Sequence, residues 1–240
     1  MDFTPVVAAR TMQSLYIWLD LVFLAGFVGL LFYSKRHRAL VAGIIGGVVY
    51  FFVDYGIFYQ LLGTRVVEGA DPLWFLAWLS LSYGITNFAW IWLWLDRDER
   101  ILEWSLFIVS GWLFVALLSQ NMGYDAAPIA ISRGTSDYHG VMALLLFLGY
   151  GGLCAYNIWQ PHAAKRAPLL WILAIGILVQ FSWEAVLALS GIRNLDWSTF
   201  LVNSVLETNM GLPYLYVIHR YVTQRLRERQ AAVELATGVD

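Results

Sequence analysis

The feature that most constrains this chain is a series of long apolar stretches joined by short polar turns. About 20 mainly apolar residues are enough for one helix to cross the hydrocarbon core of a bilayer. Only 13% of the residues are charged, about half of the roughly 25% that is typical of a soluble domain. The sequence therefore predicts an all-α fold, a polytopic membrane bundle of seven transmembrane helices, at residues 15–34, 39–62, 73–95, 101–119, 138–158, 168–190 and 198–222.

The distribution of Lys and Arg predicts how the bundle lies in the membrane. The segment Lys35–Arg38, the turn His162–Arg166 and the C-terminal tail are basic, whereas the loops on the opposite side carry only Arg65, Arg133 and Arg193. Because cytoplasmic loops carry an excess of Lys and Arg, we expect an integral multi-pass membrane protein with the N-terminus outside or luminal and the C-terminus cytoplasmic. Residues 1–222 would form the transmembrane domain and 223–240 a cytoplasmic tail.

Two parts of the chain share a pattern of residues. Asp54 is followed by Gly63-Thr64-Arg65 and then by Thr86-Asn87, and Glu184 is followed by Gly191-Ile192-Arg193 and then by Thr208-Asn209. The corresponding spans are four apart, so both copies would point the same way across the membrane. This pattern favours a 3+1+3 parallel pseudo-repeat, an arrangement related to those found in some transporters.

Four carboxylates lie inside the apolar stretches: Asp20, Asp54, Glu184 and Glu207. A charge in hydrocarbon is costly, so an acid there usually faces a partner or a cavity and marks a functional site. From the helical rise of about 1.5 Å per residue, all four are expected at a similar depth in the outer half of the bilayer. We expect Asp20 to snorkel to the interface and the other three to share a cavity.

Aromatic and amide side chains accompany these three acids at helical spacing. Gln180 with Glu184, and Asn203 with Glu207, are four residues apart and share a helix face. Apolar and aromatic walls with a few convergent polar groups are the usual form of a small-molecule site. The candidate binding residues are Tyr50, Tyr55, Phe58, Tyr83, Asn87, Gln180, Trp183, Asn203 and Asn209.

Some of these residues have a simpler interpretation. Asn87, Asn203 and Asn209 could instead form hydrogen bonds between helices, as polar residues in membrane bundles often do. Gly211 and Pro213 predict a kink in the last span. The connection at residues 120–137, with two glycines and Pro128, is expected to cap one end of the bundle.

Several classes of function are not expected. The sequence has no cluster of His and Cys that would predict a metal site. It also has no phosphate-binding loop or other cofactor motif. The net charge of −2 gives no basic footprint for nucleic acid. Lysine occurs only at positions 35 and 165, both in loops, which excludes a retinal protein. The single cysteine, Cys154, permits no internal disulfide, and the oligomeric state cannot be read.

The chain resembles the small seven-helix integral-membrane terpene cyclases of meroterpenoid and indole-diterpenoid pathways. The resemblance rests on size, on seven spans, on Asp54 and Glu207 in an early and the last span, and on the pair Trp183-Glu184. In such enzymes an acid protonates a terminal epoxide or an alkene of a lipophilic prenylated substrate, and a carbocation cascade closes the rings. The resemblance implies that Asp54, Glu207 and Glu184 are catalytic, with Asp54 the favoured proton donor and Glu184 acting through Gln180. Trp183-Glu184 lies in the sixth span, which departs from the family pattern.

Two other functions fit the same residues. A small-solute or proton-coupled transporter would also have membrane acids and parallel repeats, although its acids should not all lie at one level. A lipid-binding sensor or scaffold would need the pocket but no proton transfer. Uptake into proteoliposomes separates the transporter from the others, and the formation of cyclic products separates an enzyme from a binder.

Overall fold

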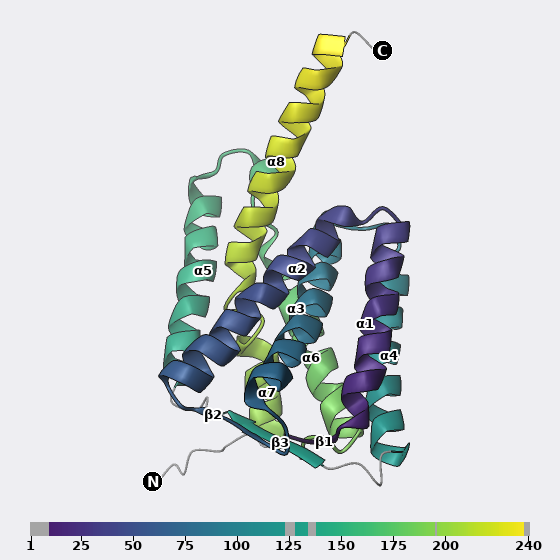
Figure 1. The fold of residues 1–240 in the computed structure, drawn as a ribbon. Coiled ribbons are helices and arrows are strands. Elements are labelled where there is room, and N and C mark those ends of the chain that lie inside the picture. The colour runs from purple at the N-terminus through teal and green to yellow at the C-terminus, as the bar shows by residue number, and fades with distance from the viewer. Residues whose placement is uncertain (1–9, 123–127, 134–137, 195, 238–240) are drawn as a thin grey trace.

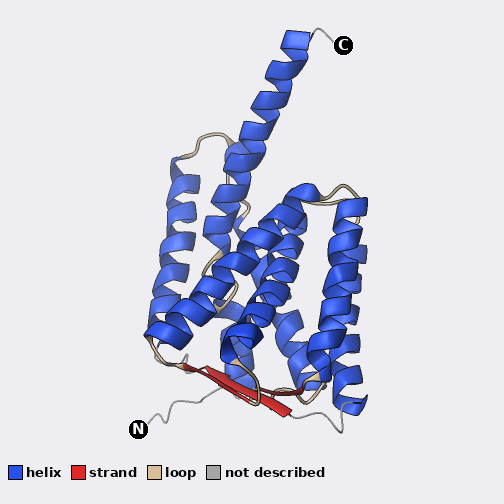
Figure 2. Cartoon of the chain, viewed as in Figure 1, coloured by secondary structure: helices blue, strands red, loops and turns tan. Residues whose placement is uncertain are grey.

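The computed structural model describes residues 10–122, 128–133, 138–194 and 196–237 as a bundle of helices with a small sheet at one end (Figures 1 and 2). Five of the described helices are long and apolar enough to cross a membrane, which indicates a multi-pass membrane protein. These five spans are Leu15–Tyr33, His37–Leu61, Ile101–Met122, His139–Trp159 and Ala163–Leu189.

The helices follow the predicted apolar stretches closely. The second span begins as an α-helix and continues without a break into a π-helix. The helical elements are α1 (Leu15–Tyr33), α2 (His37–Phe51), η1 (the π-helix Phe52–Leu61), α3 (Pro72–Asp96), α4 (Ile101–Met122), α5 (His139–Trp159), the short 3-10 turn η3 (Ala163–Lys165), α6 (Leu169–Leu189), α7 (Trp197–Leu206) and α8 (Leu212–Thr237).

The predicted seventh span is interrupted. α7 ends at Leu206, α8 begins at Leu212, and a turn of five residues separates them. Pro213 has no N–H with which to continue the hydrogen bonding of α7, and its ring clashes with the carbonyl four residues earlier. The expected kink at Gly211 and Pro213 is therefore a full break, and Glu207 lies at its start. Beyond the break α8 continues to Thr237, so the predicted tail is helical as far as that residue.

α3 is the most enclosed long helix of the bundle. Fourteen of its residues, among them Ser80, Thr86 and Asn87, are buried. A helix that is buried on most of its surface lies inside a bundle. α3 and the α7–α8 segment are not among the five spans that length and apolarity identify, so the structure supports five of the seven predicted spans.

A three-stranded antiparallel sheet, which the sequence analysis did not predict, lies across one end of the described bundle (Figure 2). β3 (Pro128–Arg133) is the central strand, between β1 (Arg10–Gln13) and β2 (Arg65–Glu68). β3 belongs to the connection that was predicted to cap the bundle, of which residues 123–127 and 134–137 lie outside the described part. The strands are too short and too polar to register as apolar runs, although Val66, Val67, Ile129 and Ile131 are β-branched.

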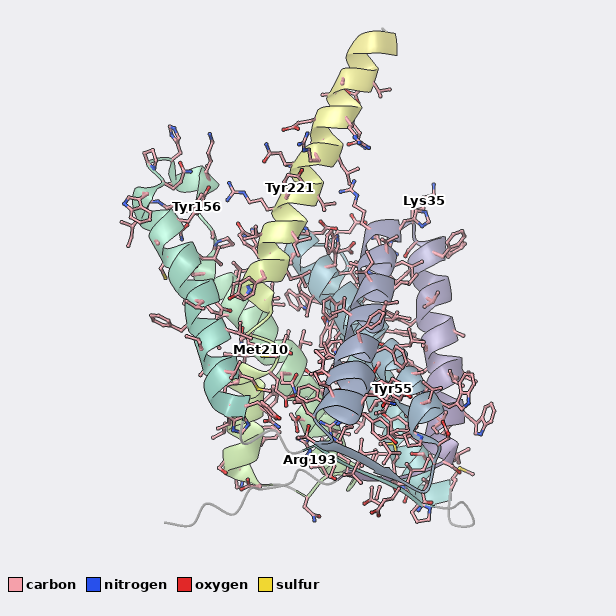
Figure 3. All side chains as sticks on the ribbon, turned by 60° about the vertical axis from the view of Figure 1, so that its left-hand side comes forward. Lys35, Tyr55, Tyr156, Arg193, Met210 and Tyr221 are labelled. Carbon is pink, nitrogen blue, oxygen red and sulfur yellow. The ribbon has the colours of Figure 1, made fainter. Side chains whose placement is uncertain are left out.

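The two ends of the bundle differ in character. Lys35, Tyr156 and Tyr221 lie at the end opposite the sheet, whereas Arg193 lies at the sheet (Figure 3). The basic turn after α1 and the start of the charged part of α8 therefore share one end. There, Arg36 forms an ion pair with Asp98 at 2.5 Å. Burial raises the pKa of Asp98, but the hydrogen bonds from Arg36 and from the Arg100 backbone outweigh it, and the pKa is lowered.

Glycine allows α2 and α3 to pack at very short distance. Gly84 of α3 lies directly against Gly47 of α2, and a Cβ atom at position 84 would come within 2.3 Å of the Gly47 Cα. Gly43 and Gly47 are four residues apart on α2, which is the small-residue spacing that lets membrane helices approach. This contact holds the second span, which carries Asp54, against the central helix.

We predict that Gly84→Ala destabilises the protein by about 1–3 kcal/mol, because the new methyl group meets backbone that cannot move aside. Gly26→Ala is the matched control, because a Cβ at position 26 of α1 would meet nothing within 4 Å. The free energy of unfolding, measured by denaturant titration in mixed micelles, checks both. Equal stability of the two variants would show that the α2–α3 contact is looser than described.

Candidate functional site

The two copies of the sequence pattern form the same local structure. Each acid lies in a helix that ends in a glycine of left-handed conformation, with φ of +62° at Gly63 and +72° at Gly191. Glycine adopts this conformation without strain and commonly terminates helices. The chain reverses there, and the arginine two residues later turns back toward the acid. Each copy is therefore the end of a helix whose buried acid is paired with an arginine from the turn that follows.

In the first copy the pair is Asp54 and Arg65. Arg65 Nη2 donates to Asp54 Oδ2 at 2.9 Å, and both side chains are buried. Asp54 is in the π-helix η1 and Arg65 is the first residue of β2. π-helical turns are rare and occur frequently at functional sites. The pair joins the second span to the sheet.

In the second copy the carboxylate contacts two arginines. Arg193 Nη1 donates a short hydrogen bond to Glu184 Oε2, and Arg10 Nη2 lies 3.8 Å from Glu184 Oε1. Arg10 and Arg193 also form a β-bridge, and the Arg10 guanidinium lies 6.0 Å from the centre of the Trp183 ring. Burial and the charge of Arg10 lower the pKa of Arg193 to about 10, so this guanidinium remains charged at neutral pH.

Gln180 connects Glu184 to Glu207. Its Nε2 donates to Glu207 Oε2 at 2.7 Å and to Glu184 Oε1 at 3.3 Å. Its Oε1 accepts from the hydroxyls of Tyr83 at 3.0 Å and Thr208 at 2.8 Å. Both the nitrogen and the oxygen of this fully buried amide therefore form hydrogen bonds, and these bonds fix its orientation. Glu207 is thereby held at the break between α7 and α8.

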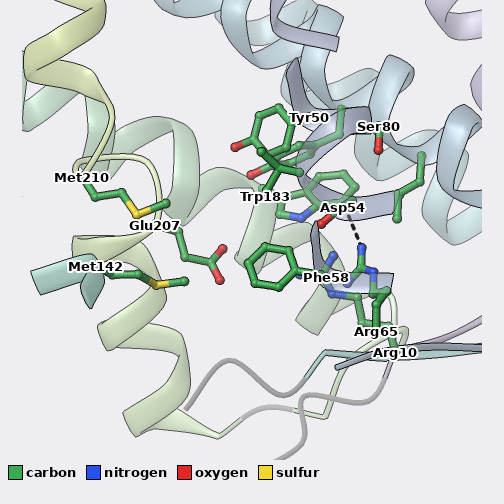
Figure 4. Close-up of a pocket in the computed structure, with 13 residues that line it drawn as sticks. Arg10, Tyr50, Asp54, Phe58, Arg65, Ser80, Met142, Trp183, Glu207 and Met210 are labelled. Atoms are coloured by element: carbon green, nitrogen blue, oxygen red, sulfur yellow. Dashed lines mark hydrogen bonds and ion pairs between the residues drawn. The ribbon is translucent and has the colours of Figure 1, made fainter. Parts of the chain in front are cut away.

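A chamber of about 120 Å³ lies beneath the sheet, between these charged groups. Asp54 and Glu207 border it from opposite sides, and Arg10 and Arg65 enter from the sheet (Figure 4). Its aromatic wall is continuous, because the Tyr83 ring lies 5.2 Å from Tyr50 and 5.1 Å from Trp183 between centroids. The remaining lining residues are Val53, Phe58, Leu79, Ser80, Met142 and Met210.

The structure brings together most of the predicted binding residues. Tyr50, Phe58, Tyr83 and Trp183 line the chamber, and Gln180 forms the hydrogen bonds described above. Asn87 borders the adjacent cavity together with Glu207.

The other three predicted binding residues line neither the chamber nor the adjacent cavity. Tyr55 stacks between Phe51 and Tyr59. Asn209 accepts a hydrogen bond from Tyr150 at 2.8 Å, which is the interhelical role proposed as its alternative. Asn203 is buried in α7.

Asp20 does not snorkel. Its side chain is buried, with a residue exposure of 2%, and it accepts a hydrogen bond from Trp78 Nε1 at 2.9 Å. Trp78 of α3 supplies a donor inside the bundle, so the carboxylate need not reach the interface. Asp20 does not border the chamber. Of the three acids expected to share a cavity, Asp54 and Glu207 line the chamber, whereas Glu184 does not line it and is connected to Glu207 through Gln180.

The sequence analysis missed the three arginines as members of the site. It noted Arg65 and Arg193 as part of a repeated pattern, but not as counter-ions of the acids that precede them. The signal was present, because an acid in a span followed within about a dozen residues by Gly-x-Arg allows the arginine to fold back. Arg10 carried no such signal, since β1 brings it into place.

Comparison of the chain with protein-family models, with curated proteins and with solved structures finds no match.

We predict that Asp54→Asn lowers the free energy of unfolding by about 3–5 kcal/mol, because it leaves the Arg65 charge buried without its carboxylate. The double variant Asp54→Asn/Arg65→Gln should recover part of this loss, and Glu103→Gln, an exposed acid on α4, should have no effect. Denaturant titration of the wild type, Asp54→Asn, Arg65→Gln and the double variant gives the coupling energy. Additive losses would show that the two side chains do not interact.

Proposed function

We propose that this protein is an integral-membrane cyclase that protonates an epoxide or an alkene of a lipophilic prenylated substrate and closes rings through carbocations. The observation that carries the proposal is the placement of Glu207. Its carboxyl group borders an aromatic-walled chamber inside a membrane bundle and is held there by Gln180. A positioned acid in a site that excludes water is what starting such a cascade requires.

The reaction is an isomerisation that consumes no cofactor. The Glu207 carboxyl transfers its proton to the epoxide oxygen, and one C–O bond breaks to leave a carbocation on the more substituted carbon. Alkene π-electrons of the same chain then form C–C bonds in turn. Loss of a proton from carbon to a carboxylate ends the cascade, so that atoms and charge balance. An alkene substrate would take the first proton on carbon instead.

We assign the donor role to Glu207 rather than to Asp54. Glu207 borders both the chamber and the adjacent cavity, whereas Asp54 borders the chamber and is tied to the sheet by Arg65. Gln180 holds the Glu207 carboxyl group at this position. Asp54 would then stabilise positive charge from across the chamber, and Glu184 would hold Gln180 in place for Glu207.

The aromatic wall supports this chemistry. The faces of Tyr50, Tyr83 and Trp183 can stabilise a cation that has no water to solvate it. The two ion pairs neutralise Arg65 and Arg193, so that these guanidinium groups do not oppose a developing positive charge.

We also propose the arrangement of the chain in the membrane. The seven-segment topology, with α3 as a span inside the bundle and α7–α8 as a broken last span, keeps the two acid-bearing helix ends on the same side. The basic loops then place the C-terminus in the cytoplasm and the sheet outside or in the lumen. The 3+1+3 relationship is supported by the two Gly-x-Arg helix ends.

We predict that Glu207→Gln lowers the rate of cyclisation by roughly 10²–10⁴-fold, the usual contribution of a general acid, while the protein stays folded in detergent. Asp54→Asn should also abolish turnover, whereas Glu184→Gln should be less severe. The measurement is product formation by membranes given epoxidised and plain prenylated arenes. Normal turnover by Glu207→Gln would overturn the assignment of the donor, and Glu103→Gln serves as the control.

A proton-coupled transporter is the second candidate, because Glu207 lies at the break of a discontinuous helix. Broken helices at a substrate site are characteristic of secondary transporters. Reconstituted protein that accumulates a labelled solute in response to a proton gradient, and forms no cyclic product, would favour this function over the cyclase.

A further inference from the structure

The chamber alone is too small for the substrate that the proposed function requires. Its volume is about 120 Å³, whereas sites for small molecules usually measure about 300–1,000 Å³. The rest of such a ligand must therefore occupy space outside the chamber.

A second cavity adjoins the chamber. It has a volume of about 200 Å³ and shares Tyr50, Val53, Glu207 and Met210 with the chamber. Glu207 thus borders both spaces. We call this second cavity the junction.

A third and larger space adjoins the junction and extends toward the opposite end of the bundle. This groove has a volume of about 560 Å³ and shares Val49, Phe88, Gly211 and Leu215 with the junction. It lies between α2, α3 and α8, and its lining is almost entirely apolar. On α2 it runs from His37 to Val49, a distance of about 18 Å at 1.5 Å per residue.

The groove is open along its side, on the exposed apolar face of the bundle. Val41, Ile45 and Val49 line it from α2, and each is about half exposed. Only its far end is polar, where His37 and Arg38 border it. An apolar trough that is open to the bilayer along its side admits a hydrocarbon chain directly from the membrane.

Asn87 provides an independent indication of a ligand at the inner end. Its residue exposure is 3%, and neither its Oδ1 nor its Nδ2 forms a hydrogen bond with the described protein. It borders the junction beside Glu207 and Thr208. A buried amide without partners is costly, and a ligand with an oxygen function at this point would satisfy it.

We propose that groove, junction and chamber form one binding site for a linear polyprenyl chain that enters sideways between α2 and α8. The chain lies along the groove with its polar head toward His37 and Arg38. Its oxygenated end reaches the junction, where Asn87 binds the oxygen beside Glu207, and its terminal isoprene unit lies against Tyr50, which lines both the junction and the chamber. This inference rests on the proposed function and adds the path, the orientation and the binding residue.

Whether a polyprenyl chain occupies the groove is tested with a farnesol analogue that carries an alkyl diazirine on its chain. After irradiation in nanodiscs, adducts mapped by mass spectrometry should concentrate on groove residues of α2 and α8. Val49→Trp, which fills the inner end of the groove, should lower this labelling by roughly tenfold, the size of effect that small changes in an apolar pocket produce. Val48→Trp is the matched control, because Val48 is exposed to a similar degree but does not line the groove.

The outcomes separate this inference from the proposed function. If labelling is spread evenly over all exposed helices and is equal in both variants, the probe binds only as surrounding lipid does. This result would overturn the inference. Cross-links between two copies of the chain through α2 and α8, without probe adducts, would overturn it in favour of a dimer. Groove labelling without any cyclic product would retain the groove and overturn the cyclase. If Val49→Trp does not fold, the pair Ile45→Trp and Ile44→Trp replaces it.

We predict that Asn87→Leu lowers labelling at the junction and cyclisation by roughly tenfold or more, without lowering the thermal unfolding temperature of the ligand-free protein. A residue that only joins helices would give the opposite result, because losing its hydrogen bonds would destabilise the protein. A lower unfolding temperature with unchanged labelling would therefore overturn the role of Asn87 as a ligand-binding residue.

Discussion

Two buried carboxylate–guanidinium pairs hold this site together. Asp54 with Arg65, and Glu184 with Arg193, each join a membrane helix to the turn that follows it. Removing one partner of such a pair leaves an uncompensated charge in an apolar interior, which is strongly destabilising. The positions of both helix ends, of the strand β2 that starts at Arg65, and of the chamber beneath the sheet therefore depend on these two contacts.

The helices could be predicted from the sequence because length and apolarity decide whether a segment crosses a membrane. The sheet could not, since β1, β2 and β3 are short and lie far apart along the chain. The same limit applied to Arg10, which reaches Glu184 only because β1 forms a bridge with Arg193. Local patterns identified the acids and contained Arg65 and Arg193, whereas long-range strand pairing added Arg10.

The candidate site was predicted in part. Helical spacing placed Gln180 beside Glu184, and the structure adds its bond to Glu207. Spacing could not show that Asp20 has a donor in Trp78, because that contact joins α1 to α3. It could not separate Asn87 from Asn209 either. Both directly follow a threonine, yet Asn209 meets Tyr150, whereas Asn87 faces a cavity.

The central claim is that Glu207 meets the reactive end of a chain that arrives through the groove. The most direct test is the structure of the Glu207→Gln variant with an unreacted epoxidised prenyl arene. The account predicts the epoxide oxygen within hydrogen-bond reach, about 2.6–3.2 Å, of the amide that replaces the carboxyl, with the hydrocarbon lying between α2 and α8. An epoxide that lies away from this position, or a ligand bound elsewhere on the bundle, would contradict it.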